Sequence, residues 1–501
     1  MISILDTTLR DGEQTSGVSF VEQEKLSIAR LLLEDLKVDR IEVASALVSE
    51  GEFNIVRNIT RWAATSGHLH QIEVLGFVDG RRSLEWIEKA GAKVINLLCK
   101  GSQKHCSLQL GKKPSEHIAD IRKVVEYASE MGIDVNLYLE DWSNGISQSP
   151  DYVYTLINEL RDLPIRRYML PDTLGVLTPT STGQYCRAMI ERYPDLQFDF
   201  HAHNDYDLAV ANVYAAVQAG IHCVHTTING LGERAGNAPL SSVIAVLNDH
   251  LKVKTNIDEK QINRVSKIVE TYSGIRIPAN MPVIGENVFT QVAGVHADGD
   301  IKSKLYYNEL LPERFGRTRE YALGKTSGKA NIRKNLQAMG IQLDEKTMKK
   351  VTERIIALGD KKQMVTPEDL PYIVSDILKT ENIEEKFIIR NYALSLTKDL
   401  KPLANLSAEV DGKIYNESST GDGQYDAFMK ALWKILDSMH RPHPTLTDYA
   451  VTIPPGGRTD AFVQTVITWN MDGRVFKTHG LDADQTEAAI KATIKMLNTI
   501  Y

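Results

Sequence analysis

Two histidines in a short apolar segment carry the clearest chemical signal in the sequence. His201 and His203 lie two positions apart in the predicted strand 197–203, and side chains at i and i+2 of a strand point to the same face. Both imidazoles could therefore bind one cation. A carboxylate from Asp11 and an amide oxygen from Asn237 would complete a mixed nitrogen and oxygen set suited to Mg²⁺, Mn²⁺ or Zn²⁺. The alternative is that the two histidines are structural and hydrogen-bonded.

Charged residues elsewhere could act beside such a site. Arg10 immediately precedes Asp11, and an arginine next to a metal is suited to bind a carboxylate through two parallel hydrogen bonds. The alternative for Arg10 is a structural salt bridge. Glu140 could act as a general base or orient a water, or it could only hold a neighbouring side chain. His296 lies far along the chain in a predicted loop, and its spacing alone gives it no role.

These residues, His296 apart, follow predicted strands or lie at their ends. The predicted strands are 2–5, 40–45, 71–77, 93–98, 134–139, 166–170, 197–203 and 223–228, with helical patterns such as 21–36 and 115–132 between them. Eight such units in roughly 250 residues predict a closed (β/α)8 TIM barrel. An open doubly wound sheet is the alternative, but no G-x-G-x-x-G motif follows the first strand. Because barrel active sites lie at the C-terminal ends of the strands, we expect these side chains at one mouth.

The chain continues well beyond the predicted barrel. Residues 1–260 form the predicted catalytic barrel, 261–385 a mostly helical linker region, and 386–501 a compact α+β module. In this module, strand-like segments at 387–396, 407–415, 448–453 and 461–471 alternate with helical ones at 425–436 and 485–500. The pattern suggests two similar units of strands and helix. No catalytic cluster is evident there, which favours a binding or dimerisation role.

The composition limits the class of protein. The chain has 501 residues and a formal net charge of −7, so no basic excess exists to neutralise nucleic-acid phosphates. The four cysteines are scattered, which disfavours a disulfide framework. No apolar run approaches ~18 residues, so no membrane span is expected, and the N-terminus does not resemble a signal peptide. We therefore predict a cytoplasmic enzyme that binds neither nucleic acid nor membranes.

Three separate motifs resemble one enzyme family. The segment 6–14 (DTTLRDGEQ) resembles the first signature of the isopropylmalate, homocitrate and citramalate synthases, while 201–205 (HAHND) with 229–237 (NGLGERAGN) resembles the second. The segment 294–298 (GVHAD) is similar to the catalytic histidine segment of that family. The resemblance covers the whole chain, including a C-terminal module similar to the LeuA-type regulatory domain that responds to leucine or isoleucine.

The resemblance implies roles for individual residues. The implied metal ligands are Asp11, His201, His203 and Asn237; the implied oxoacid contacts are Arg10 and Thr173; and the implied acid–base pair is Glu140 and His296, with His296 reaching the barrel of a partner subunit in a homodimer. Tyr306 lies in the same linker region and is expected near the substrate. The family uses acetyl-CoA as a substrate and a divalent metal ion. A base removes a proton from the acetyl group, the enolate attacks a ketone that the metal polarises, and water hydrolyses the thioester.

The segment around Glu140 indicates which oxoacid is used. Isopropylmalate synthases typically have Phe-Ser-x-Glu-Asp there, whereas this chain has Leu-Tyr-Leu-Glu-Asp, which places Tyr138 two residues before Glu140. Leu75 and Leu98 are expected at the same mouth, and with Tyr138 they match the pyruvate pocket of citramalate synthases. The resemblance therefore implies (R)-citramalate synthesis for isoleucine, with a branched-chain amino-acid effector. The alternative is a 2-isopropylmalate synthase of leucine biosynthesis that uses 2-oxoisovalerate, and these three residues could instead be ordinary core residues.

Two readings from other classes stay open at this point. A metal-dependent lyase on a related barrel could cleave a hydroxyacyl-CoA, although such lyases generally lack a long C-terminal module. A non-catalytic amino-acid sensor could retain an inactive barrel, although the ligand set at the strand ends is intact.

Overall fold

The protein forms two compact units, seen in a computed structural model. The structure describes residues 1–293, 295–296, 298–299, 305–360, 365, 367–378, 387–452 and 463–500. The first unit comprises Met1–Thr290 with Tyr307–Arg319, and the second comprises Gln291–Tyr306 with Glu320–Tyr501.

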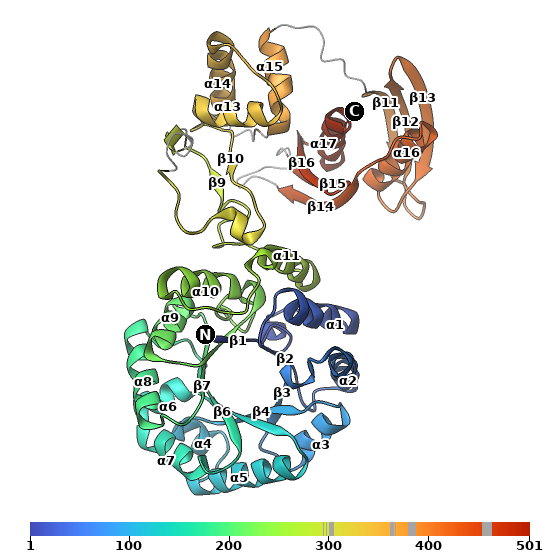
Figure 1. Cartoon of the computed structure of the whole chain (residues 1–501). Coiled ribbons are helices and arrows are strands. Elements are labelled where there is room, and N and C mark those ends of the chain that lie inside the picture. The colour runs from blue at the N-terminus through green and yellow to red at the C-terminus, as the bar shows by residue number, and fades with distance from the viewer. Residues whose placement is uncertain are drawn as a thin grey trace. The chain divides into compact units, whose positions relative to one another are not determined.

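Eight parallel strands close into a barrel in the first unit, with β1 paired to both β2 and β8. The strands are β1 (Ser3–Asp6), β2 (Arg40–Ser45), β3 (Ile72–Phe77), β4 (Val94–Lys100), β5 (Asp134–Glu140), β6 (Ile165–Asp172), β7 (Phe198–Ala202) and β8 (Cys223–Thr226). Figure 1 looks along the barrel and shows its helices around the strands. The predicted TIM barrel is confirmed, and the open sheet is excluded.

Helices surround the barrel, most of them along its outside. They are α1 (Glu22–Arg30), α2 (Glu50–Ser66), α3 (Arg82–Lys89), α4 (Gln103–Leu108), α5 (Pro114–Glu130), α6 (Trp142–Gln148), α7 (Pro150–Leu160), α8 (Pro179–Arg192), α9 (Ala209–Ala219), α10 (Leu240–Val246) and α11 (Ile262–Ser273). Capping residues define the ends of these helices, and α2 is an example. The Ser49 hydroxyl accepts a hydrogen bond from the Glu52 N–H at the start of α2, and the helix ends at Gly67, whose φ is 80°.

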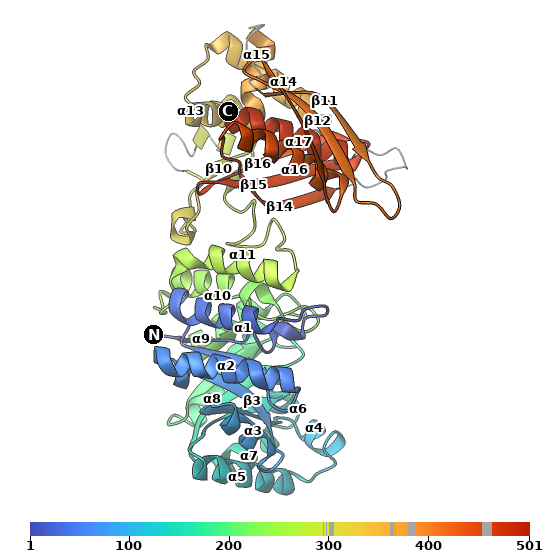
Figure 2. The same cartoon turned by 90° about the vertical axis from the view of Figure 1, so that its right-hand side faces the viewer.

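Two strands run further toward the mouth than the sequence pattern predicts. We expected strands at 93–98 and 134–139, but β4 ends at Lys100 and β5 ends at Glu140. The parallel pairing simply continues, with Lys100 opposite Glu140. The local sequence pattern does not reveal that neighbouring strands still pair at these charged residues. α4 and α6, which follow these strands, lie at the end of the barrel opposite the amino terminus (Figure 2).

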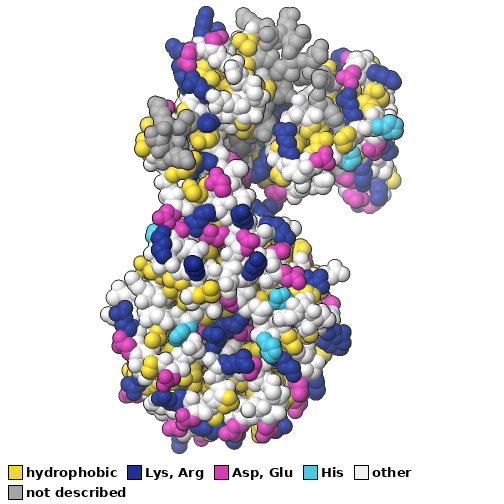
Figure 3. All heavy atoms as spheres, in the orientation of Figure 1, with side chains coloured by type: hydrophobic (Ala, Val, Ile, Leu, Met, Phe, Trp, Pro, Cys, Tyr) yellow, Lys and Arg dark blue, Asp and Glu magenta, His cyan; other side chains and the backbone are white. Residues whose placement is uncertain are grey.

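Buried charges lie near the beginnings of the strands. The Arg40 guanidinium contacts Glu73 at 2.6 Å and Asp199 at 2.5 Å, and Arg167 contacts Asp199 at 3.2 Å. In Figure 3, Lys and Arg side chains gather over the centre of the barrel. Because the Asp199 carboxylate is fully buried, its charge is tolerable only beside these guanidinium groups.

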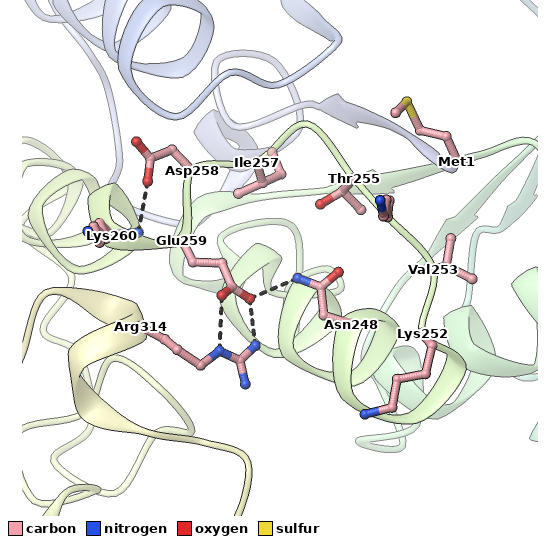
Figure 4. A pocket seen from close by; sticks show the side chains of 11 residues that line it. Met1, Asn248, Lys252, Val253, Thr255, Ile257, Asp258, Glu259, Lys260 and Arg314 are labelled. Carbon is pink, nitrogen blue, oxygen red and sulfur yellow. Dashed lines mark hydrogen bonds and ion pairs between the residues drawn. The ribbon is translucent and has the colours of Figure 1, made fainter.

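The chain leaves the first unit after Thr290 and later returns to it at Tyr307–Arg319. Within η7 (Pro312–Phe315), the Arg314 guanidinium donates to both carboxylate oxygens of Asp249 at 2.8 and 3.0 Å, and to Glu259 at 2.7 and 3.0 Å. Figure 4 shows the Glu259 contacts beside a cavity of about 660 Å³. The returning segment is therefore fixed to the barrel by charge-assisted hydrogen bonds.

The second unit contains a helical part and an α+β module. The helices α13 (Lys329–Ala338), α14 (Glu345–Asp360) and α15 (Leu370–Leu378) share an apolar core with residues such as Ile332, Val351 and Leu370. Two short strands, β9 (Thr290–Gln291) and β10 (Glu320–Tyr321), pair with each other. The predicted helical region followed by an α+β domain is confirmed.

The α+β module repeats one construction twice. Its elements are β11 (Phe387–Ser395), β12 (Leu403–Val410), β13 (Lys413–Thr420), α16 (Gln424–Ser438), β14 (Thr445–Thr452), β15 (Val463–Met471), β16 (Arg474–Asp482) and α17 (Gln485–Ile500). Each three-stranded antiparallel sheet is followed by one helix, and both helices contribute to one apolar core around Trp469. The expected repeat of strands and helix is therefore present.

The sequence interpretation missed two hairpins in this module. The segment 407–415 was expected to be a single strand, and the strand β16 was not expected. In the structure Asp411-Gly412 separates β12 from β13, with φ values of 49° and 76°, and Asp472-Gly473 separates β15 from β16, with φ values of 51° and 85°. Positive φ at both central residues is the geometry for which Asp-Gly is favoured in tight hairpins. The turn signal was therefore present in the sequence at both hairpins.

Across the described ranges, the helices are too short or too polar to span a bilayer. All four cysteines are buried and unpaired.

We predict that Asp199→Asn lowers the free energy of unfolding by about 3 kcal/mol, because it removes one partner of a buried ion pair. Urea denaturation of the full chain measures this loss. The matched control is Asp134→Asn, which breaks the more exposed 2.7 Å pair with Arg166 and should cost less than about 1 kcal/mol. Equal losses for the two variants would contradict the importance of burial.

Candidate metal centre and active site

Three of the predicted ligands converge at the C-terminal ends of the strands. Asp11 follows β1, His201 belongs to β7, and His203 lies just beyond β7. Possible ligand atoms of these three buried residues lie within 4.8 Å of one another. The Asp11 Oδ2 atom lies 3.1 Å from His201 Nε2 and 3.9 Å from His203 Nε2. The strand period therefore places both imidazoles against one carboxylate.

Asn237 is brought to the same place by a glycine-rich loop. It forms an isolated antiparallel bridge with His203, and its Nδ2 donates to the Leu231 carbonyl at 3.1 Å. The loop needs glycine at two points. A Cβ on Gly232 would lie 2.4 Å from Asn237 Nδ2, and one on Gly236 would lie 2.0 Å from the Gly230 carbonyl oxygen. Both glycines have positive φ. The loop thereby leaves Asn237 Oδ1 available as a ligand.

The electrostatics favour the forms that bind a cation. Burial lowers the pKa of His201 and of His203 to about 4, so both imidazoles are neutral near pH 7. Burial alone would raise the pKa of Asp11, but Arg10 and the two histidines hold it well below its usual range. Asp11 Oδ2 and Asn237 Oδ1 are buried and have no hydrogen-bond partner among the described residues. Two orphaned oxygens and two neutral imidazoles fit a divalent cation.

A second cluster of ligand-type residues lies deeper in the barrel. Asp199, Cys223 and His225 also offer atoms within 4.8 Å of one another. However, the Arg40 guanidinium lies 2.5 Å from Asp199 and 2.9 Å from the Cys223 sulfur. A fixed positive charge thus already neutralises this cluster, which makes it a poor place for a metal ion.

Arg10 is held by a buried polar chain that sequence reasoning did not find. Its Nε donates to Glu42 at 2.5 Å, and its Nη1 lies 3.5 Å from Asp11. Asn96 donates to the other Glu42 oxygen at 2.7 Å, and Asn136 donates to Asn96 at 2.9 Å. Arg10 is therefore both ion-paired and aimed at the metal centre, so the two interpretations of this residue are compatible. The sequence did offer one signal for this polar chain. Asn96 and Asn136 each lie two residues before a predicted pocket residue, Leu98 and Tyr138, and therefore on the same strand face.

The three predicted pocket residues lie together. Leu75, Leu98 and Tyr138 belong to one apolar cluster inside the barrel, which also includes Leu5, Met169 and Cys223. The Tyr138 ring meets the His201 ring edge-on, with centroids 5.7 Å apart. An apolar wall therefore adjoins the metal centre.

Glu140 and Thr173 lie at the rim. The Glu140 carboxylate forms an ion pair with Lys100. The Thr173 hydroxyl accepts a hydrogen bond from the Asp141 N–H at 2.9 Å. Asp141 itself has a φ of 64°, in the left-handed region that Asp and Asn adopt more readily than other non-glycine residues. The turn directly after Glu140 is thus tied to the end of β6.

His296 and Tyr306 belong to the second unit. Their ring centroids are 4.2 Å apart, with an angle of 38° between the ring planes. The segment 294–298, in which the sequence predicts a catalytic histidine, is described only in part, because Gly294 and Ala297 lie outside the described residues.

Comparison with known proteins assigns the family. The HMGL-like family matches residues 1–269, the homocitrate synthase post-HMGL domain-like family matches 283–363, and the LeuA allosteric (dimerisation) domain matches 364–501. The chain is 32% identical over 502 residues to the (R)-citramalate synthase CimA of Methanocaldococcus jannaschii, covering 100% of this chain and 99% of that one. It is 33% identical over 506 residues to the 2-isopropylmalate synthase of the same organism, covering 100% and 94%.

These full-length matches confirm the resemblance drawn from the motifs. Because relatives with two different substrates are equally similar, overall identity does not separate the two activities. The chain belongs to the HMGL-like family, in the group of acyltransferases that includes the citramalate and 2-isopropylmalate synthases.

Proposed function

We propose that the protein condenses acetyl-CoA with pyruvate to give (R)-citramalate and CoA, in isoleucine biosynthesis. The observation that carries this proposal is the apolar wall of Leu75, Leu98 and Tyr138 beside His201. An oxoacid held at the metal centre would direct its side chain toward such a wall. Three large side chains suit the methyl group of pyruvate better than a branched group.

The residues of the site divide the chemistry between them. Asp11, His201, His203 and Asn237 would hold a divalent ion (Mg, Mn or Zn), which supplies Lewis-acid polarisation of the ketone when bound. Arg10, kept in place by Glu42, would bind the oxoacid carboxylate with its remaining N–H groups, and Thr173 would contact the same substrate.

Proton transfer is assigned to residues outside the ligand set. Glu140, partly open at the rim, would accept a proton from the acetyl methyl group. His296 would act as its acid–base partner. Water then hydrolyses the thioester and releases CoA.

The second candidate is 2-isopropylmalate synthesis from 2-oxoisovalerate. The 33% identity to a 2-isopropylmalate synthase over the full chain favours it as strongly as the citramalate synthase match favours the first candidate. The apolar wall decides our preference, because Tyr138 occupies a position where the branched-substrate enzymes typically have serine.

The match to a LeuA allosteric (dimerisation) domain supports a homodimer with an amino-acid effector. We propose that the effector is isoleucine and that His296 serves the barrel of the partner subunit. The proposed division is catalytic barrel 1–260, linker 261–385 and regulatory module 386–501; Tyr306, near His296, would lie close to the substrate.

We predict that the wild-type enzyme has a higher kcat/KM for pyruvate than for 2-oxoisovalerate, by about 10-fold or more. Tyr138→Ser should reduce this preference because it removes bulk from the wall. Release of CoA with each oxoacid measures both values. The matched control is Tyr127→Ser on the outer helix α5, which should leave the preference unchanged. A wild-type preference for 2-oxoisovalerate would favour the second candidate.

We predict that exhaustive chelation abolishes turnover and that Asp11→Asn lowers the content of divalent metal, because it weakens the charge of the ligand set. Elemental analysis after dialysis measures the content. Cys223→Ser serves as the control, since its cluster already contains Arg40 and should hold no ion. Full turnover after chelation would contradict the assignment.

We predict that Asp11→Asn and His296→Ala are each inactive as homodimers, and that co-expression of the two variants restores activity. A mixed dimer would keep one barrel with intact ligands and one intact histidine able to serve it. Removing the acid–base group should cost ~10²–10⁴-fold in kcat. Differently tagged subunits isolate the mixed dimer, and inactivity of that dimer would show that the histidine does not act across subunits.

A further inference from the structure

Strands β4 and β5 place three matched pairs of side chains inside the barrel. Their register sets Asn96 opposite Asn136, Leu98 opposite Tyr138, and Lys100 opposite Glu140. The first pair is hydrogen-bonded at 2.9 Å, the second belongs to one apolar cluster, and the third is an ion pair. The first pair supports Arg10 through Glu42, and the second pair lines the proposed pocket. The third pair therefore lies directly above the pocket, and only one of its members has a proposed role.

Two side chains hold the backbone of Lys100. Its N–H donates to His117 Nε2 at 3.0 Å, and its carbonyl oxygen accepts from the Tyr152 hydroxyl at 2.8 Å. Burial lowers the pKa of His117 to about 4, so the imidazole stays neutral and can accept this bond. The next residue, Gly101, donates to the Glu140 carbonyl at 2.6 Å, and a Cβ there would lie 2.4 Å from the Leu139 carbonyl oxygen.

The backbone that carries Glu140 is also held, through the next residue, Asp141. The Asp141 carboxylate accepts hydrogen bonds from Ser102 at 2.7 Å and from Asn144 at 2.8 Å. The Ser102 contact ties the segment after β5 to the segment after β4. The backbones that carry both members of the ion pair are therefore held together by hydrogen bonds.

The burial of Lys100 needs a reason. Its side chain is only 10% exposed, whereas that of Glu140 is 25% exposed. Desolvating an ammonium group is costly, and a buried ion pair often adds nothing to stability compared with apolar residues. In the described part of the chain, Lys100 is the sole ion-pair partner of Glu140. A costly charge aimed at the proposed base points to a role in the reaction.

We propose that Lys100 is a positioning residue that holds the Glu140 carboxylate at the rim of the pocket, oriented for proton transfer; this rests on the proposed function. In that step a methyl C–H bond of acetyl-CoA breaks and an O–H bond forms on Glu140. The electron pair passes to the enolate, so the negative charge moves from Glu140 to the thioester oxygen. The ammonium group stays beside the Glu140 carboxyl group throughout, and no other reactant is needed.

Substitution of Lys100 by methionine tests this proposal, because methionine keeps the bulk and removes the charge. We expect Lys100→Met to lower kcat by about 10- to 100-fold, the effect of a misplaced reacting group, while KM for pyruvate stays near the wild-type value. The isotope effect with trideuterated acetyl-CoA should rise, since proton removal becomes slower than later steps. Lys100→Arg should recover most of the activity. In the Glu140→Gln background, Lys100→Met should cost little more.

The control is Lys112→Met, which removes a half-exposed ion pair with Asp120 and should change none of these values. An unchanged isotope effect, or an equal loss in the Glu140→Gln background, would show that Lys100 is only structural. A crystal structure of Lys100→Met gives a test that does not depend on activity. A displaced Glu140 side chain is expected, and an unmoved one overturns the proposal. Absence of CoA release by the wild-type enzyme with every oxoacid would instead refute the proposed function.

Discussion

The buried carboxylate of Asp11 is the constraint around which the active site is arranged. It lies out of solvent between a guanidinium and two neutral imidazoles. Arg10 and the two histidines hold the pKa of this carboxylate well below its usual range, and Glu42 accepts a hydrogen bond from Arg10 Nε. The glycine-rich loop adds the Asn237 oxygen without adding charge. A divalent cation would supply what this arrangement lacks, which is a positive centre for two orphaned oxygens.

The interior of the barrel separates three kinds of chemistry along its axis. Ion pairs around Arg40 lie near the beginnings of the strands, an apolar cluster fills the middle, and the polar site lies toward the mouth. The side chains that point into the barrel, from alternate residues of each strand, form these layers, as is general for this fold. The apolar layer is not continuous, because the His225 ring lies 5.4 Å from that of His201, so the lower network meets the ligand set at this point.

The second unit is constructed differently from the barrel. Two sheets of antiparallel strands each carry one helix, and a single apolar core joins them. No metal-type cluster of His, Cys and carboxylates is found among its described residues. Its proposed contribution to chemistry is the His296 segment, and the chain on both sides of that segment belongs to the first unit. Phe289 stacks on Phe315 there, with ring centroids 6.1 Å apart, and Arg314 secures the returning chain.

The sequence by itself determined the barrel, because strands and helices have different apolar periods that can be read locally. It also determined that His201 and His203 share a face, since this follows from alternation along one strand. The grouping of Leu75, Leu98 and Tyr138 came from the resemblance to a known pocket, and the structure confirms that they lie together. It did not reveal Lys100 opposite Glu140 or Glu42 under Arg10. Those pairs join residues from different strands and loops. Their meeting depends on the register and closure of the barrel, which only the tertiary structure decides.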